Sequence, residues 1–445
     1  MSSTGRTIVD ALSRAVADHG DRTAVDDGAR RLTFRELGAS VREVAAAFVA
    51  AGVQRGDVVS IWAPNSLEWI QAFLGAADDV SRAEADARAA AVGPDDVSDI
   101  LFTSGTTGVP KGVVQTHASA MTVGDDWIDL AGLRAGDVYL MVNPYFHMFG
   151  LKAGILASVA AGATMLPEPV FDIGRVLKRV QDEKVTVLPG APTIYQAMLD
   201  APDRASFDLS SLRAAVTGAA DIPVELIRRI FAELPFTRVA AGYGLTEAGT
   251  AAGSGPDDDE TLIATTVGRA RPTFELRLVD GDGHEVAPGE TGEVTLRGAS
   301  IMRGYLDDPE ATRAVLSDDG WLRTGDLGTI GADGCLRIVG RVKDMFIVGG
   351  FNAYPAEIEN ALLRHDAVQQ VAVIGIPDDR LGEVGMAFVV LQPGAAATED
   401  ELIAWSREEM ANYKVPRHVV FLDALPINAT GKVVKDELRA RVSPD

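Results

Sequence analysis

The chain has 445 residues, of which 47% are hydrophobic and 24% are charged, and this composition is typical of a soluble globular protein with more than one domain. Lys and Arg number 41 and Asp and Glu number 64, so the formal net charge is −23. A chain this acidic is excluded as a general binder of nucleic acid or of anionic membrane surfaces. Any phosphate that it binds must be held by local donors in a confined site.

The chain shows no sign of export or of membrane insertion. No apolar run is long enough to span a bilayer, and no apolar stretch of the signal-peptide kind follows the first residues. The single cysteine, Cys335, excludes an internal disulfide and fits a reducing compartment. We therefore expect a cytoplasmic protein without integral membrane association. The sequence does not indicate its oligomeric state.

The first predicted element is an amphipathic helix over residues 7–19, whose apolar face contains Ile8, Val9, Leu12 and Val16. In the middle of the chain, short apolar segments alternate with helical patterns. The predicted strands there are 185–188 and 212–216, and the predicted helices are 193–199 and 224–234. This alternation indicates an α/β fold with mostly parallel strands.

The pattern changes twice towards the C-terminus. From about Val267, short strands are separated by Asp-Gly and Pro-Gly turns, which indicates an antiparallel, barrel-like β region. After residue 343 the pattern resets to a separate small α+β domain. Its predicted elements are helix 356–363, strands 368–374 and 387–391, and helix 401–410.

The densest chemical signal lies between residues 101 and 112. Glycines let backbone N–H groups approach an anion, hydroxyl groups add donors, and a lysine supplies a positive charge. The residues that carry these features are Thr103, Ser104, Gly105, Thr106, Thr107, Gly108 and Lys111. The spacing is not that of a Walker-type loop. A polar surface loop is the simpler alternative, but a lysine closing so dense a run favours a phosphate site.

This segment resembles the phosphate-binding signature of the acyl-adenylate-forming superfamily, which includes acyl-CoA synthetases, nonribosomal adenylation domains and firefly-type luciferases. Further segments resemble the family's other signatures and follow in the same order. The resemblance implies a large N-terminal α/β domain over residues 1–341 and a mobile C-terminal lid over residues 342–445.

The resemblance implies roles for three further segments of the large domain. Gly218, Ala219 and Ala220 would lie along adenine, and His147, in an aromatic segment, would contact the acyl substrate. Tyr243 and Gly244 open the second nucleotide motif, in which Tyr243 would stack on adenine. Thr246 would contact the α-phosphate, and Glu247 would hold Mg²⁺, a hard cation that takes carboxylate oxygens. Taken alone, His147 would more often be a packed structural histidine, and Gly218–Ala220 would be a strand-to-helix turn.

The resemblance also implies roles for residues near and beyond the hinge. Asp326 would accept both ribose hydroxyls, Arg341 would contact ribose or phosphate, and Lys343 would be the pivot of the lid. Gly349 and Gly350 would let the thiol of coenzyme A reach the adenylate, although a simple hairpin turn is the alternative. Lys432 would bridge the carboxylate and the α-phosphate during adenylation.

The implied activity is an AMP-forming acid–CoA ligase that uses ATP, Mg²⁺ and coenzyme A. The stretches 96–102, 152–157 and 188–196 look most like an actinobacterial branch that activates the propionate side chain of a methylhexahydroindanedione, called HIP below. A medium-chain fatty acid or an aryl acid is the alternative substrate. A nonribosomal adenylation domain and a luciferase-like oxidase share the motifs.

The resemblance is interrupted once. Residue 76 leads directly into an acidic, alanine-rich stretch, where family members have further strands and helices before the phosphate loop. At roughly 30 residues for each βαβ unit, about two units are missing. We expect the junction, residues 76–91, to be an exposed helix or loop. A non-catalytic nucleotide-binding remnant is therefore a further alternative.

Overall fold

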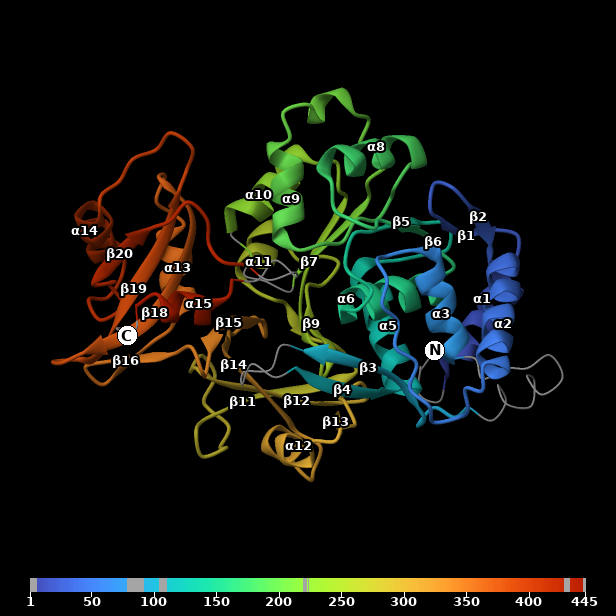
Figure 1. The fold of residues 1–445 in the computed structure, drawn as a ribbon. Helices are drawn as coiled ribbons and strands as arrows, with labels where there is room; N and C mark the ends of the chain where they lie inside the picture. Colours follow the sequence, from blue (N-terminus) through green and yellow to red (C-terminus); the bar gives the residue numbers. More distant parts are fainter. Residues whose placement is uncertain are drawn as a thin grey trace. The chain divides into compact units, whose positions relative to one another are not determined.

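The computed structural model describes residues 6–77, 92–103, 110–218, 222, 224–427 and 433–442 (Figure 1). The chain divides into two compact units. Unit 1 comprises Met1–Ala219, Val224–Leu276 and Leu296–Leu322, and unit 2 comprises Ala220–Pro223, Arg277–Thr295 and Arg323–Asp445. None of the helices described is both long enough and apolar enough to cross a bilayer.

Unit 1 begins with helix α1, Ile8–His19, as predicted from the apolar periodicity. The Thr7 side chain accepts from the Asp10 backbone N–H, and the Asp10 side chain accepts from the Thr7 backbone N–H, so a capping box starts the helix. Its buried face packs beside α2, Phe34–Ala50, and α3, Leu67–Ala77 (Figure 1). These helices cover one side of the largest core of unit 1.

Two sheets form the α/β part of unit 1. The first has the order β2-β1-β6-β5, where β1 is Thr23–Asp26, β2 is Arg31–Thr33, β5 is Val138–Met141 and β6 is Thr164–Pro167. The second has the order β10-β9-β8-β7, where β7 is Ala214–Gly218, β8 is Arg238–Leu245, β9 is Gly249–Gly253 and β10 is Arg269–Ala270. The pairs β1–β6, β5–β6 and β7–β8 are parallel, which agrees with the expected α/β class.

Residues 185–188 were predicted as a strand, but they form only single parallel bridges at Val187, to Tyr139 and to Ala214. The predicted helices over 193–199 and 224–234 correspond to α9, Pro192–Asp200, and α10, Val224–Glu233. The chain from β4 to α9 also contains α5, His117–Ala131; α6, Met148–Gly150; the π-helix η1, Leu151–Leu156; α7, Ala157–Ala161; and α8, Ile173–Glu183. Helix α11, Glu260–Thr265, and helix α12, Pro309–Val315, complete the described helices of unit 1 that have four or more residues.

A third sheet of unit 1 has the order β13-β4-β3. Strands β3, Val97–Thr103, and β4, Lys111–Thr116, form an antiparallel hairpin, and β13, Gly304–Tyr305, pairs antiparallel with β4. This sheet carries the lysine of the predicted phosphate loop.

The antiparallel region after Val267 contains a four-stranded sheet, β11-β12-β14-β15. Its strands are Phe274–Val279, Gly292–Gly298, Leu322–Ile330 and Leu336–Arg341. The antiparallel pairing expected from the turn pattern is confirmed for β14 and β15. Strands β11 and β15 are the two ends of the sheet order, so the described strands form an open sheet and not a closed barrel.

Among the described residues, the C-terminal part of unit 2 consists of one sheet and three helices, which is the α+β arrangement predicted from the sequence. Its sheet has the order β17-β16-β19-β18, with β20 parallel to β19. The strands are β16, Phe346–Val348; β17, Phe351–Ala353; β18, Val368–Asp378; β19, Gly382–Leu391; and β20, His418–Phe421. The helices are α13, Pro355–Leu362; α14, Glu399–Glu409; and α15, Lys435–Ala440.

The segment before the predicted interruption is unusual. Residues 57–64 form no strand among the described residues, although 58–63 have a strand-like apolar pattern. Ile61 packs against the core of unit 1, and the Asn65 amide donates to the carbonyl groups of Met141 and Asn143. Val58 is 72% exposed and Trp62 is fully exposed. Apolar side chains of this segment are therefore left uncovered. Of the predicted junction, residues 78–91 lie outside the described residues.

Candidate active site

The predicted phosphate loop closes the β3–β4 hairpin. Thr103 and Lys111 are cross-strand partners, and the Thr103 hydroxyl lies 3.5 Å from the Lys111 carbonyl oxygen. The loop residues Ser104, Gly105, Thr106, Thr107 and Gly108 lie outside the described residues. The Lys111 ammonium lies 4.9 Å from the centroid of the Tyr305 ring, which is within the range of a cation–π contact.

Tyr305 joins the phosphate-loop lysine to the predicted metal ligand. Its hydroxyl group donates a hydrogen bond to Glu247 Oε1 at 2.9 Å. Burial, together with the adjacent Glu247 carboxylate, raises the pKa of Tyr305 well above its ordinary value, so the phenol stays a donor at neutral pH. Sequence reasoning missed Tyr305, because a tyrosine in a short strand carries no chemical signal of its own.

The backbone of the second nucleotide motif is fixed by Gln115, which is fully buried on β4. Its amide donates to the Thr246 carbonyl oxygen at 3.1 Å and lies 3.5 Å from the Ser300 carbonyl oxygen. The Met302 backbone N–H donates to the Glu247 carbonyl oxygen at 2.7 Å. Hairpin β3–β4 therefore positions both Lys111 and the segment containing Thr246 and Glu247. Gln115 was also missed.

The predicted adenine segment lies at the carboxyl ends of the parallel strands β7 and β8. Gly218 and Gly242 are cross-strand partners, and a Cβ on Gly218 would lie 2.6 Å from the Gly242 carbonyl oxygen. A Cβ on Gly244 would lie 2.2 Å from the Gly249 carbonyl oxygen. Close backbone approach thus explains both glycines. Tyr243, which precedes Gly244, is half-buried. Ligands bind at such strand ends in α/β proteins. Ala219 and Ala220 lie outside the described residues.

His147 begins the short helix α6. Its Nδ1 accepts a hydrogen bond from the Phe149 backbone N–H at 3.1 Å, which caps the helix. The neighbouring Phe146 is 56% exposed, whereas Met148, Phe149 and Gly150 are buried. The structure gives His147 a local role as a helix cap, and contact with an acyl substrate stays a prediction.

Unit 2 holds the predicted ribose ligand. Asp326 and Arg341 are cross-strand partners on β14 and β15, and Arg341 Nε lies 3.0 Å from Asp326 Oδ1. Asp326 is buried, and its backbone N–H donates to the Thr324 hydroxyl group. The arrangement presents an acidic acceptor for a diol with a balancing cation beside it. Lys343 is exposed in the turn that follows β15.

The two glycines predicted for access of coenzyme A form the turn between β16 and β17. Val348 pairs with Phe351, and Gly349 and Gly350 have φ angles of 57° and 90°. Both angles are positive, as a two-residue hairpin turn of type I′ requires. The hairpin alternative is therefore correct, and a second role in thiol access stays a prediction. Lys432 lies outside the described residues.

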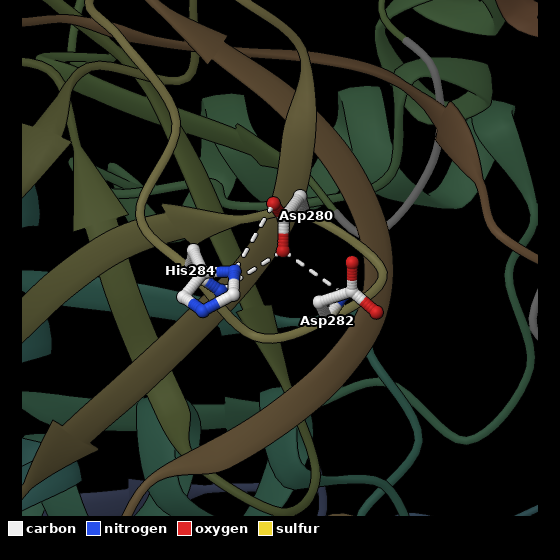
Figure 2. A group of neighbouring side chains, drawn as sticks. All are labelled: Asp280, Asp282 and His284. Atoms are coloured by element: carbon white, nitrogen blue, oxygen red, sulfur yellow. Dashed lines mark hydrogen bonds and ion pairs between the residues drawn. The ribbon is translucent and has the colours of Figure 1, made fainter.

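One group of side chains in the described part of the chain is close enough to share a metal ion. Asp280, Asp282 and His284 are exposed in the loop between β11 and β12 (Figure 2). Asp280 Oδ1 accepts from the backbone N–H groups of Asp282 and His284, so its carboxylate closes the turn. These contacts account for the group without an ion, and it does not include the predicted metal ligand Glu247.

Comparison with known proteins gives relatives across nearly the full length. A 7a-methyl-1,5-dioxo-octahydro-1H-inden-4-yl propanoyl:CoA ligase from Rhodococcus jostii is 43% identical, with 99% of each chain covered. A ligase of the same name from Mycobacterium tuberculosis is 45% identical, with 98% of each chain covered. The solved structure of the anthranilate CoA ligase AuaEII in complex with anthranoyl-AMP has a TM-score of 0.89 at 27% identity, and 99% of each chain is covered.

The comparison also bears on the interruption. The alignment with the Rhodococcus relative runs over 521 positions, and this chain has 445 residues, so at least 76 positions have no residue here. The model of the family described as AMP-binding enzyme matches in two pieces, residues 12–79 and 76–306. The two pieces meet where the sequence predicted a missing segment, after Ala76.

The model of the AMP-binding enzyme C-terminal domain matches residues 357–432. Together the two models account for most of the chain, in the order predicted from the motifs. This protein belongs to the family of AMP-binding enzymes.

Proposed function

We propose that this protein is an AMP-forming acid–CoA ligase, which makes an acyl-adenylate from ATP and a carboxylic acid and then an acyl-CoA thioester. The observation that carries the proposal is the connected group Lys111–Tyr305–Glu247, held by Gln115 beneath the Thr246 backbone. It combines a cation from β4, a protonated phenol from β13 and a carboxylate from the turn between β8 and β9. The relatives named as CoA ligases at 43% and 45% identity support the same activity.

The chemistry explains the need for this group. Attack of a carboxylate on the α-phosphate brings two anions together, so cationic and hydrogen-bonding groups must balance the charge. In the proposed reaction Lys111 attracts the phosphates, Thr246 contacts the α-phosphate, and Asp326 binds the ribose hydroxyls. Lys432 bridges the carboxylate and phosphate during the first half-reaction, and Gly349 and Gly350 admit the thiol in the second.

A magnesium ion fits the donor set. Glu247 offers a half-buried carboxylate, and its orientation is fixed by the Tyr305 hydroxyl group and the Met302 backbone. Carboxylate oxygens are suitable ligands for Mg²⁺, which usually binds through one or two carboxylates together with substrate phosphates. When bound, the ion would neutralise phosphate charge. ATP and coenzyme A are cytoplasmic metabolites, and the one cysteine, Cys335, is buried as a free thiol, so we place the reaction in the cytoplasm.

We propose the HIP propionate as the acid, because the relatives from Rhodococcus and Mycobacterium are named for that substrate. The test is a panel of acids that contains HIP propionate, octanoate and benzoate, incubated with ATP, Mg²⁺ and coenzyme A. Mass spectrometry of the thioesters and pyrophosphate release are the two measurements. HIP propionate should give the highest rate. Faster turnover of octanoate or benzoate would contradict the substrate assignment and leave the ligase reaction intact.

A non-catalytic nucleotide-binding protein is the second candidate function, and one observation favours it. The chain lacks at least 76 positions of a full-length relative, and Val58 and Trp62, which precede the interruption in the sequence, are exposed. Under this alternative, ATP binds and no acid in the panel releases pyrophosphate. Calorimetric titration of ATP alongside the panel separates the two functions.

A further inference from the structure

Lys152 is the most deeply buried cation in the described part of the chain, with no exposed surface. Its Nζ lies 3.1 Å from Asp99 Oδ1, whose side chain is only 5% exposed. Burial lowers the pKa of Lys152, and the Asp99 carboxylate opposes that shift. A buried ion pair costs more in desolvation than well-packed apolar side chains of the same size. A contribution to the stability of the fold therefore does not explain why this ion pair is present.

The two partners belong to the two segments predicted to handle the two substrates. Lys152 lies on the π-helix η1, which directly follows His147 and helix α6. Asp99 lies on β3, which ends at Thr103 and leads into the phosphate loop. The link between the acyl segment and the nucleotide segment is made inside unit 1.

The surroundings of the pair fix both segments. Asp99 Oδ2 accepts from the Ser98 hydroxyl group at 2.6 Å, and Asp99 is the cross-strand partner of Gln115, which holds the Thr246 carbonyl. On the other side, the buried Tyr139 hydroxyl donates to the Ala153 carbonyl oxygen, next to Lys152. A π-helical turn is a rare irregularity that is frequent at functional sites. Here all six of its residues are buried, and it carries the lysine to β3.

We propose that Lys152 and Asp99 are a positioning pair that couples the acyl-binding segment 147–156 to the phosphate-binding hairpin β3–β4. Neither residue touches a substrate. The pair sets the register between the two segments, so that occupation of one site favours the binding geometry of the other. The expected effect on ligand binding rests on the proposed function, whereas the effect of the pair on the positions of the two segments does not.

The first experiment is independent of ligands. Amide hydrogen exchange is measured on the whole protein and on the variant Lys152→Met/Asp99→Asn, which removes both charges and leaves no unpaired one. Exchange should speed up by at least tenfold in both segments, residues 97–103 with 111–116 and residues 147–156. Faster exchange in only one of the segments, or in neither, overturns the proposal.

The matched control is a second ion pair of unit 1, in which Asp137 is buried and Arg213 is partly buried. Arg213 lies 2.6 Å from Asp137, whose side chain is 4% exposed, and neither residue belongs to the two segments. The variant Arg213→Met/Asp137→Asn should lower the melting temperature without faster exchange in both segments together. If it loosens both segments as the test variant does, the link is a general loss of stability and the proposal fails.

The second experiment concerns coupling between ligands. The Kd of α,β-methylene-ATP is measured with and without saturating HIP propionate. We expect the acid to tighten nucleotide binding about fivefold or more, as coupled sites do, and the double variant to reduce this ratio to near one. An unchanged ratio in a folded variant overturns the coupling. If the unaltered protein binds nucleotide but forms no thioester with any acid, the proposed function fails, and the exchange experiment still decides the positioning pair.

Discussion

The Tyr305 hydroxyl group donates to the Glu247 carboxylate at 2.9 Å, while the Lys111 ammonium lies near the ring of the same tyrosine. One side chain therefore contacts both charges of the proposed nucleotide site. It comes from β13, far along the chain from the phosphate loop, and pairs with the strand on which Lys111 lies.

Tyr305→Phe tests this relationship. The variant keeps the aromatic ring near Lys111 and removes the donor to a charged acceptor, an interaction worth about 1.5–3 kcal/mol. We expect kcat/KM for ATP to fall roughly 10- to 100-fold, with a small change in melting temperature. Thr164→Val is the control, since it removes another hydroxyl group of unit 1, one that donates to the Thr23 carbonyl oxygen and lies in neither of the predicted substrate segments. It should lower the melting temperature and leave the KM for ATP unchanged, and the reverse pattern would contradict the assignment.

Lys432→Ala separates the two half-reactions. If the ammonium group bridges carboxylate and phosphate only during adenylation, the variant should lose adenylate formation by more than about 100-fold. It should still convert a supplied acyl-adenylate and coenzyme A into thioester at close to the original rate. Pyrophosphate release and thioester formation are followed separately, and an equal loss in both would show that the roles are not divided.

Asp126 gives the stability a defined dependence on pH. Burial raises its pKa to about 6, although Thr273 donates to its carboxylate at 2.6 Å. The pKa in the unfolded chain is near 3.8, so between pH 4 and 6 the folded state binds more protons than the unfolded state. The contribution of this group to stability therefore falls as the pH rises through that range, by about 3 kcal/mol in all at 1.4 kcal/mol per unit.

Asp126→Asn removes this titration and retains an acceptor for Thr273. At pH 5 the carboxyl of the unfolded chain is already ionised and about half of this contribution is lost, so the variant should melt higher by roughly half of the difference seen at pH 8. At pH 8 the variant should melt several degrees higher, because only the unaltered protein then carries a buried negative charge. Thermal melts at both pH values check this. A difference in melting temperature that is the same at pH 5 and pH 8 would refute it.

Restoring the missing segment from a full-length relative should raise both stability and activity. In the present chain Trp62 is fully exposed and Val58 is 72% exposed, which leaves apolar surface without a covering layer. We expect the restored chain to melt several degrees higher and to form thioester faster. Equal melting temperatures and rates for the two chains would mean that the shortening is tolerated.

Trp62 also reports directly on that surface. Of the five tryptophans in the chain, Trp69, Trp127 and Trp321 are buried. Acrylamide should therefore quench a red-shifted component of the fluorescence, and Trp62→Phe should remove most of it. In the restored chain the same tryptophan should be protected from quenching. Quenching that is the same with and without Trp62 would contradict the exposure.

Sequence reasoning succeeded where a short pattern determines a local structure. The 3.6-residue periodicity predicted helix α1, and two glycines in a row indicated the turn at Gly349 and Gly350. The predicted strand at residues 185–188 was wrong, because Val187 makes only single bridges to two neighbouring strands and the segment does not form a strand of its own. Pairing of that kind depends on neighbours that are distant in sequence.

The sequence predicted the motifs of the candidate site, but it did not predict the residues that hold those motifs in place. Tyr305 and Gln115 are ordinary residues in ordinary strands, and only the pairing of β13 with β4 and the burial of β4 bring them to Glu247 and Thr246. The sequence did not predict the ion pair of Lys152 and Asp99 for the same reason. Residues 53 positions apart in the chain meet through packing, which no local pattern encodes.

The hairpin that carries Lys111 has an electrostatic consequence. In a Walker-type site the phosphate loop opens a helix, whose dipole contributes a fixed partial positive charge that no proton or salt ion removes. Here the chain after the loop continues as strand β4, so the dipole of a following helix is not available at Lys111. Attraction of the nucleotide then depends on mobile full charges in a protein with a net charge of −23. Its association rate with ATP should therefore respond strongly to ionic strength and to free divalent cations.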